Sequence, residues 1–349
     1  METLLLLKAL IALVPVVLLL FVFDRLDAFD LINLRDILLL LGGGGVIAAL
    51  CFFTNLRVLD GFPMGLSDYS RYVAPAIEET LKAAPIIVLF AVNRLGFKVD
   101  AAIAGFALGA GFSVVENLWY LYMISEANVS GWLVRGFGTA IMHGGTTALF
   151  AIASHEMTER QAEAAAAQYR FNLLLFLPGL ALAIILHGLF NALAGAPLIA
   201  MAATLLLAPA TIFFALARNE RATRRWLASD RAAHARMLAE IRAGHFGDSE
   251  RGRAIKAAAK HLGSEAAGDV LAYAELKTEL ILRAEELILA AQDGAAAEIS
   301  AGERDKFERL RALERRLGKA AIAAIESELG FTRNDLWELG RLMKRAEAA

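Results

Sequence analysis

Residues 72–90 read YVAPAIEETLKAAPIIVLF, an apolar stretch of membrane-spanning length that carries Glu78, Glu79 and Lys82 inside it. A helix needs roughly 20 apolar residues to cross the hydrocarbon core, and an ionisable side chain at that depth is costly and usually functional. Lys82 follows Glu78 by four residues and Glu79 by three, so its ammonium can reach either carboxylate on a helix. The stretch therefore predicts a membrane helix that gathers two acids and a base.

The whole chain is too apolar for an ordinary soluble protein. Of its 349 residues 58% are hydrophobic, and the mean hydropathy is +0.52. Residues 218–349 hold 46 charged side chains, whereas residues 1–217 hold 26. We therefore expect a membrane domain over residues 1–217 and a soluble helical domain over residues 218–349. The net charge of −2 gives no sign of a nucleic-acid partner, and the single cysteine, Cys51, excludes an intramolecular disulfide.

The expected fold is all-α: a polytopic bundle of about seven transmembrane helices with a soluble helical domain at the C-terminus. The first apolar segment is too long for a signal peptide and no small-residue cleavage site follows it, so we interpret it as a retained span. Lys and Arg near the span ends favour an external N-terminus and a cytoplasmic C-terminal domain in the cell membrane. The seven segments are 4–23, 37–53, 72–92, 101–124, 132–154, 171–192 and 197–217.

Polar residues recur at one depth on four of these expected spans. Allowing about 1.5 Å per residue and alternating span directions, they fall in one slab of the outer half of the membrane. His187 and Asn191 also share one helix face. The set comprises Glu78, Glu79 and Lys82 on the third span, Glu116 and Asn117 on the fourth, His143 on the fifth, and His187 and Asn191 on the sixth. We predict that they line one water-filled pocket, because unpaired charges cannot face lipid.

Each feature alone also has a structural explanation. Pro75 suits the first turn of an interfacial helix, where Glu78 and Glu79 would be stabilised by the helix dipole. Glu116 with its neighbour can form an interhelical hydrogen bond, and a lone histidine is often a packing residue. Arg135, near the outer start of the fifth span, is expected to extend to the membrane surface. The common depth of the acids and imidazoles favours the pocket.

Glycines within the spans indicate close helix packing. Gly42–Gly45, Gly105, Gly109 and Gly111 are small enough to let helix backbones approach in lipid. We assign them no chemistry.

The C-terminal part carries signals for helix boundaries. Ser300-Ala-Gly-Glu303 and Thr332-Arg-Asn-Asp335 predict helix starts, because a hydroxyl caps the first turn and an acid three residues on supports it. Gly318 and Gly330 suit turns or helix ends. His234, His245 and His261 show no ligand-like spacing with acids, so we expect them on the surface.

Taken in order, these residues resemble the PrsW family of intramembrane proteases, part of the wider group that contains the CAAX prenyl endopeptidases. The resemblance covers about residues 70–192. It departs at Asn191, where PrsW-like proteins often have Asp. It rests on Glu78-Glu79-x-x-Lys82, Gly109-Ala-Gly-Phe112-x-x-x-Glu116-Asn117, His143 and His187-x-x-x-Asn191.

The resemblance implies hydrolysis of a peptide bond within or near the membrane. The substrate would be a membrane-anchored protein, such as a single-span anti-sigma factor, and the lipid bilayer would surround the enzyme. The helical tail suits a cytoplasmic partner.

The residues themselves fit such a hydrolysis. One of Glu78 and Glu79 would act as the general base that activates water, while Lys82 favours charge on one of the two acids. His143 and His187 would steady the oxyanion or protonate the leaving amine. Asn191 would orient His187 or add an oxyanion donor, and Glu116 would accept hydrogen bonds.

Three alternatives stay open. Two histidines with glutamates also suit zinc, but the chain has no HExxH motif, which favours a metal-free mechanism, so no cofactor is assigned. A proton or ion transporter would also place acids in spans, although no internal repeat is visible. A non-catalytic scaffold of the same fold is the third, because fold alone does not fix function.

Overall fold

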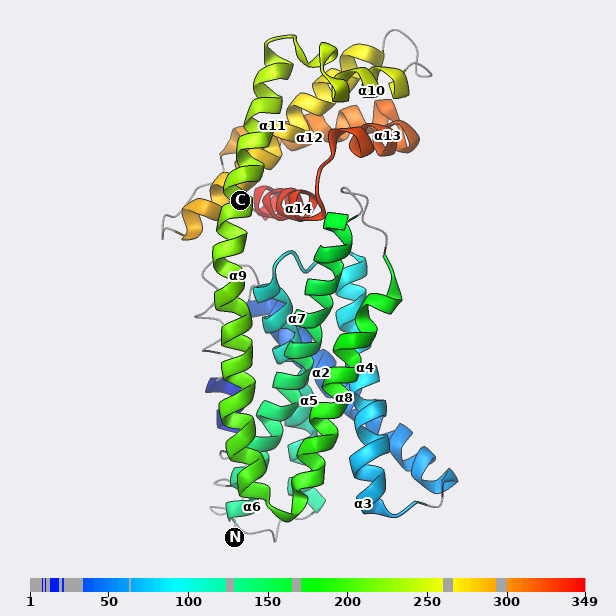
Figure 1. Ribbon diagram of the computed structural model, residues 1–349, viewed down its shortest axis with the longest axis vertical. Helices are drawn as coiled ribbons and strands as arrows, with labels where there is room; N and C mark the ends of the chain where they lie inside the picture. Colours follow the sequence, from blue (N-terminus) through cyan, green and yellow to red (C-terminus); the bar gives the residue numbers. More distant parts are fainter. Residues whose placement is uncertain are drawn as a thin grey trace. The chain divides into compact units, whose positions relative to one another are not determined.

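The computed structural model describes residues 34–62, 64–123, 129–164, 171–259, 266–292 and 300–348, with a few residues before residue 22 (Figure 1). These residues are helical with short connections and contain no strand, which confirms the all-α fold. The chain forms two compact units, Met1–Arg160 with Phe171–Asn219 and Gln161–Arg170 with Glu220–Ala349. Of the expected span over residues 4–23, the structure describes only residues 8, 10, 13–18 and 21, which are helical.

Within the described residues, four segments are long and apolar enough to cross a membrane. They are α2 (Leu34–Gly61), α5 (Lys98–Met123), the run Leu173–Gly195 and the Pro197–Ala215 part of α9 (Pro197–Arg242). The run comprises η3 (Leu173–Phe176), α8 (Leu177–Ala192) and η4 (Leu193–Gly195). Two further expected spans are also helical, as α4 (Ala74–Ala91) and α7 (Ala140–Ala164), but they carry polar residues. The number of seven spans stays a prediction.

Helix α5 packs closely against two neighbours because glycines line its contacts. A Cβ on Gly44 of α2 would lie 1.9 Å from the Leu108 carbonyl oxygen of α5. A Cβ on Gly109 of α5 would lie 2.2 Å from the carbonyl oxygen of His143 in α7. Only hydrogen fits at either position, as expected for small residues at membrane helix contacts. The glycines thus let α5 lie directly against the backbones of both α2 and α7.

A short π-helix directly precedes each of two helices that carry polar residues. After α3 (Leu66–Asp68), η1 (Tyr69–Val73) runs into α4. After α6 (Val129–Leu133), η2 (Val134–Thr139) runs into α7. π turns are rare overall, but those that occur are often found at functional sites. Pro75 lies in the first turn of α4 and has no N–H to offer the carbonyls of η1, of which that of Ser70 accepts a hydrogen bond from the Asn191 side chain.

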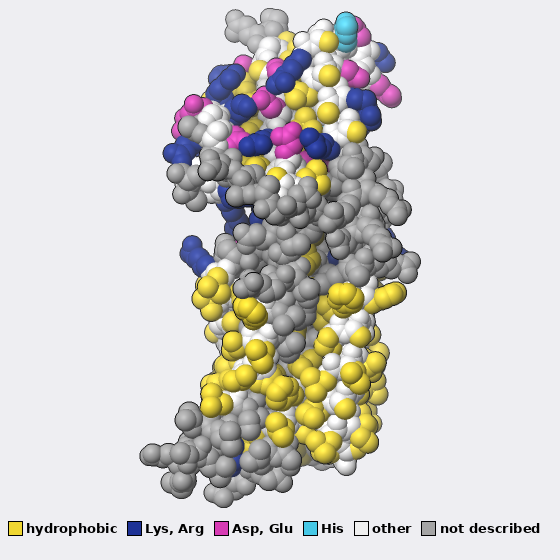
Figure 2. Space-filling model, turned by 90° about the vertical axis from the view of Figure 1, so that its left-hand side faces the viewer, with side chains coloured by type: hydrophobic (Ala, Val, Ile, Leu, Met, Phe, Trp, Pro, Cys, Tyr) yellow, Lys and Arg dark blue, Asp and Glu magenta, His cyan; other side chains and the backbone are white. Residues whose placement is uncertain are grey.

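The surface of the first unit is strongly apolar. Figure 2 shows hydrophobic side chains gathered over the helices of this unit, and mixed charges over those of the second unit. A large exposed apolar surface marks contact with a membrane or a partner. Exposed large side chains include Leu39, Val46 and Phe53 of α2, Ile185 and Leu189 of α8, and Leu206, Phe213 and Phe214 of α9.

The second unit is a helical bundle with its own core. Its described helices are the last part of α9, η5 (Phe246–Asp248), α10 (Glu250–Ala259), α11 (Ala266–Gln292), α12 (Ala301–Leu317), α13 (Lys319–Leu329) and α14 (Arg333–Ala348). Tyr273, Ile281, Ile325 and Leu342 are buried within it. An independent apolar core is what a soluble domain requires.

The predicted helix boundaries in this unit are confirmed. Ser300 and Glu303 form a reciprocal capping box at α12. The Thr332 N–H donates to Asp335 Oδ2 at 2.6 Å, and the Asp335 N–H donates to Thr332 Oγ1 at 3.2 Å. Gly318 and Gly330 have φ of 79° and 71°, a region that favours glycine, beside the ends of α12 and α13.

The expectation for the tail histidines was wrong for one of them. His245 is exposed, as expected, and His261 lies outside the described residues. His234 is buried, and its Nδ1 lies 2.7 Å from Oε1 of Glu285. The partner is 51 residues further along the chain, so local spacing could not reveal it.

Candidate active site

Glu79 is the most buried acid of the predicted site. Only 2% of its side chain is exposed, and Oε1 accepts a hydrogen bond from Nζ of Lys82 at 2.5 Å. The same oxygen lies 2.8 Å from Nδ1 of His187 on α8. Thr146 Oγ1 of α7 is 3.5 Å from both carboxylate oxygens. The carboxylate thus joins α4, α7 and α8, and it fixes the orientation of the His187 ring.

Glu78, the neighbouring acid, has a more open position. Its side chain is 12% exposed, and Oε2 lies 3.9 Å from Nε2 of His187. Its Oε1 accepts a hydrogen bond from Nδ2 of Asn55 at 3.1 Å. The hydroxyl of Tyr69 donates to Asn55 Oδ1 at 2.9 Å, which holds the amide in place. Glu78 is therefore positioned by α2 and η1, with one oxygen toward the imidazole.

Sequence analysis missed Asn55. A single amide on an apolar helix indicates helix packing as readily as a site. The only signal was that it is a polar residue within α2, and α2 lay outside the stretch of resemblance.

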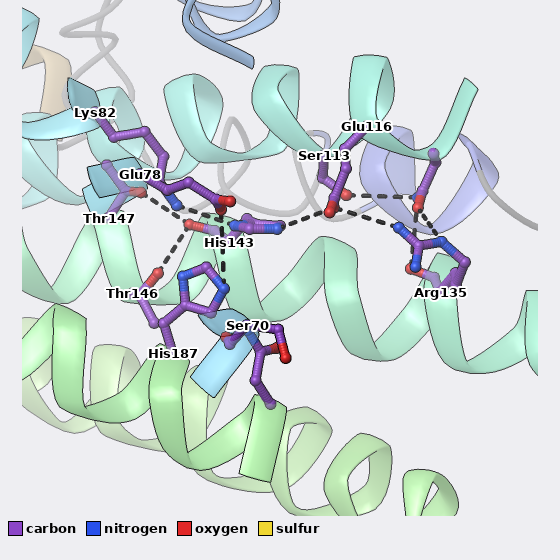
Figure 3. Close-up of polar contacts among 12 residues, drawn as sticks. Ser70, Glu78, Lys82, Ser113, Glu116, Arg135, His143, Thr146, Thr147 and His187 are labelled. Carbon is purple, nitrogen blue, oxygen red and sulfur yellow. Dashed lines mark hydrogen bonds and ion pairs between the residues drawn. The ribbon is translucent and has the colours of Figure 1, made fainter. Parts of the chain in front are cut away.

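His143 connects the acids of α4 to the acid of α5. Its Nδ1 lies 3.0 Å from Nζ of Lys82, and its Nε2 lies 3.1 Å from Oε2 of Glu116. Because an ammonium only donates, Nδ1 accepts and the Nε2–H is left to donate to Glu116. Figure 3 shows this chain of contacts from Lys82 through His143 to Glu116 and Arg135. The ring also meets that of His187 edge-on, with centroids 4.9 Å apart.

The expectation that Arg135 extends to the membrane surface was wrong. Its Nη2 lies 3.4 Å from Oε2 of Glu116, and its Nε donates to Oδ1 of Asn117 at 3.2 Å. The guanidinium also stacks 3.6 Å from the ring centroid of Tyr120. The guanidinium binds an acid and an amide on the neighbouring helix instead of reaching the membrane surface, because a charge–charge pair is strong where water is scarce.

Asn191 has a different neighbour from the one expected. Its Nδ2 donates to the backbone carbonyl of Ser70 at 2.7 Å and so joins α8 to η1. The ring of His187 is instead oriented by Glu79. Asn191 therefore anchors the helix that carries His187, one turn away.

A cavity of about 730 Å³ opens beside these residues. A pocket of this size with apolar walls and a few convergent polar groups is the usual form of a ligand site. Glu79 and Lys82 are not among the lining residues, so they form a layer behind it. The polar lining includes Glu78, Glu116, Arg135, His143, His187 and Asn191, and the apolar lining includes Phe52, Trp119 and Phe190. The structure therefore brings all seven predicted residues to one place, as five lining residues and two behind them.

Three of these residues can also hold a metal ion. Glu78, His143 and His187 each offer a ligand atom, and these atoms lie within 4.8 Å of one another. Two imidazoles and one carboxylate are a ligand set that zinc takes in catalytic sites, with a fourth position left for water. The carboxylate of Glu79 on the far nitrogen of His187 is the supporting contact that metal-bound histidines usually have. The donor set thus fits zinc once the His143 ring gives up its contact with Lys82 or with Glu116, because each of its two nitrogens faces one of them.

Carboxylates and imidazoles buried beside a cavity, in a bundle of membrane-length helices, are the groups that a membrane-embedded hydrolase needs. A family model described as "PrsW family intramembrane metalloprotease" matches residues 35–217, more than half of the chain. The chain belongs to this family and is an intramembrane peptidase in the general sense. The match begins at α2, and so it includes Asn55. Searches of curated proteins and of solved structures gave no match.

Proposed function

We propose that the chain hydrolyses a peptide bond of a membrane-anchored protein and that Glu78 is the carboxylate that activates the water. One observation carries this assignment. Of two adjacent acids, Glu78 lines the cavity, whereas Glu79 is buried against Lys82 and His187. A general base must reach the proton that it abstracts, and that proton belongs to a water in the cavity.

The histidines and their partners complete the reaction. Water gives a proton to Glu78 as its oxygen attacks the peptide carbonyl. The Nε2–H of His143, now directed at Glu116, is available to the oxyanion that develops. The C–N bond then breaks, and the leaving amine receives a proton through His187, whose Nε2 faces Glu78. Glu79 and Lys82 act as positioning residues that hold the two rings.

The family's description as a metalloprotease favours zinc over the metal-free mechanism that the missing HExxH motif favoured. Glu78, His143 and His187 are the residues that would hold the ion. Each imidazole would then give a ring nitrogen to the ion, so the donor roles of the two histidines above belong to the metal-free route. When bound, zinc supplies a Lewis acid for the carbonyl and lowers the pKa of its water. A carboxylate has two oxygens, so Glu78 has one for an ion and one for the water proton.

The substrate that we propose is a single-span protein, with an anti-sigma factor as the family-based example. The apolar wall of the cavity, which includes Phe52, Trp119 and Phe190, suits a segment that leaves the bilayer. We further propose that the N-terminus is external, and that residues 218–349 are cytoplasmic and bind a partner there.

Cleavage in cells tests the assignment. Membranes from cells that express the wild-type chain are compared by quantitative proteomics with membranes that contain Glu78→Gln or His187→Ala. The matched control is Glu156→Gln, an acid on α7 whose side chain is 37% exposed and pairs with Lys98 and Arg160. We expect a membrane protein whose cleaved form is present with wild type and control and absent with both site variants. Cleavage that persists with Glu78→Gln would refute the proposed role of Glu78.

A further inference from the structure

A second group of acids with a histidine lies in the second unit, and it shares no residue with the membrane site. Asp230 and His234 come from α9, Glu285 from α11 and Asp335 from α14. Each offers one ligand atom, and these four atoms lie within 4.8 Å of one another. The ring of Phe331 lies 5.7 Å from that of His234 between centroids.

The geometry around His234 differs between its two ring nitrogens. Nδ1 lies 2.7 Å from Oε1 of Glu285, a hydrogen-bond distance. Nε2 lies 3.7 Å from Oδ2 of Asp335, which is too long for a hydrogen bond. Two ligands bound about 2.1 Å from one ion are at most about 4.2 Å apart, and 3.7 Å falls within that limit. A proton on Nδ1 held by Glu285 would leave the lone pair of Nε2 for an ion.

Several carboxylate oxygens of this group are buried without a hydrogen-bond donor among the described residues. They are Oε2 of Glu285, Oδ1 of Asp335 and Oδ2 of Asp230. Both oxygens of Glu338, which follows Asp335 by three residues on α14, are in the same state. Glu285 and Asp335 are 0% exposed, and Glu338 is 1% exposed. A buried acceptor left unsatisfied is costly, and more so when it is charged. This number of unsatisfied oxygens at one point indicates that the cluster binds a positively charged group.

The protein supplies too little positive charge of its own. Four carboxyl groups lie near one imidazole. The nearby positive charges are those of Arg341, which attracts Glu338, and Arg231, which attracts Glu285. A cation bound among these carboxyl groups would supply the positive charge that the neighbouring side chains do not.

We propose that Asp230, His234, Glu285 and Asp335 bind one divalent first-row transition-metal ion, such as manganese or zinc, inside the second unit. An imidazole with carboxylates favours these ions over magnesium and calcium, which prefer oxygen ligands alone. Glu338 lies beside the ion and adds negative charge. Because the ligands come from α9, α11 and α14, the ion links three helices. Because it binds the folded unit, it stabilises that unit by RT ln(1 + c/Kd), where c is the concentration of the free ion, so the effect grows with that concentration.

The experiment uses the full chain in detergent, with Glu78→Gln and His187→Ala present so that the membrane group cannot hold an ion. The protein is washed with chelator. Manganese binding is then titrated by electron paramagnetic resonance, and zinc is counted by elemental analysis. The ligand variant adds Asp230→Asn with Glu285→Gln, which keep side-chain shape. The control adds Glu286→Gln, an acid next to Glu285 that is 43% exposed and pairs with Arg231.

We expect one ion per chain, bound at least tenfold more weakly in the ligand variant and equally well in the control. On addition of manganese, hydrogen exchange in α11 and α14 should slow in the control protein but not in the ligand variant. Exchange in the first turn of α12 reports whether the ligand variant is folded, and Asp230→Asn alone repeats the test if it is not. Absence of a stoichiometric ion, or equal binding by the ligand variant, would overturn the proposal. A network of protonated carboxyl groups would then explain the cluster. Because the membrane group is disabled throughout, these outcomes do not depend on proteolysis.

Discussion

The carboxylate of Glu79 lies 2.8 Å from Nδ1 of His187, although 108 residues separate the two in the chain. This contact fixes which nitrogen of His187 is turned toward Glu78 and the cavity. The neighbouring contact with Lys82, at 2.5 Å, holds the carboxylate from the other side. A histidine oriented by a buried carboxylate is a recurring arrangement in hydrolytic sites, and it separates the roles of two acids that are adjacent in sequence.

The separation of roles predicts that Glu79→Gln and Glu78→Gln fail in different ways. Glu79→Gln keeps the general base but loosens His187 and leaves Lys82 without its carboxylate. Per folded molecule, kcat should fall about 10–100-fold while KM changes little, and the variant should also be less stable than wild type. Glu78→Gln should abolish turnover. The measurement is cleavage of a purified substrate over a range of pH, because a misoriented His187 shifts the pH profile. Glu79→Asp should restore part of the rate. Equal losses of kcat and an unchanged pH profile in both variants would contradict this division of roles between Glu78 and Glu79.

Lys82→Met should destabilise the first unit more than any surface change. Lys82 is 0% exposed and pairs with Glu79, which is 2% exposed. Removing one partner leaves a buried charge alone, at a cost of about 3–5 kcal/mol. The measurement is thermal aggregation in detergent. Adding Glu79→Gln should recover most of the loss, because it removes the orphan charge. A Lys82→Met protein as stable as wild type would show that water reaches Glu79.

Removal of metal should stop proteolysis. We expect one zinc ion per chain at Glu78, His143 and His187, in addition to any ion in the second unit. Chelator washing should remove activity, and stoichiometric zinc should restore it. Elemental analysis of Glu78→Gln with His187→Ala should show one ion fewer per chain than wild type. Full activity in metal-free protein would show that glutamate and histidine catalyse the reaction without a metal ion.

Gly44→Ala should weaken both folding and activity, whereas Gly42→Ala on the same helix should not. A Cβ on Gly44 would meet the Leu108 carbonyl at 1.9 Å, while a Cβ on Gly42 has nothing within 4 Å. Overpacking at such a contact typically costs about 1–3 kcal/mol, and pushing α2 away from α5 also withdraws Asn55 from Glu78. Thermal stability and cleavage are measured on both variants. Equal behaviour of the two would show that the helices are not held this closely.

Acid pH should remove the stabilising effect of Glu303. Burial alone would raise its pKa, but hydrogen bonds from the Arg283 side chain and the Ser300 backbone N–H outweigh it, so the pKa is lowered. Its contribution is therefore present above the unfolded pKa of about 4.3 and is lost as the pH falls through the folded value. At pH 7, amide hydrogens in the first turn of α12 should exchange faster in Glu303→Gln than in wild type. The difference should correspond to about 1 kcal/mol in the free energy of local opening. The difference should vanish in strong acid. A difference that persists there would mean that the charge is not responsible.

The sequence predicted the arrangement of the site better than its finer geometry. Membrane depth alone brought Glu78, Glu116, His143 and His187 together, because a helix rises regularly and each span begins at a recognisable place. Asn55 and Arg135 could not be placed in the same way, since a single amide or an arginine near a span end has several stable positions. His234 was misplaced because its partners lie on distant helices. The capping pairs were predictable because all of their atoms lie within four residues.

The two π turns before α4 and α7 have a consequence for how this site tolerates change. A π turn holds one residue more than an α turn, so loss of one residue from Tyr69–Val73 can turn η1 into a regular α turn and leave the side-chain directions of α4 nearly unchanged. Loss of one residue within the regular α-helix just before Glu78 would instead rotate the preceding and following parts of α4 by about 100° relative to each other. Single-residue deletions in the π turn should therefore be tolerated better than deletions two turns further on, although neither removes a chemical group of the site.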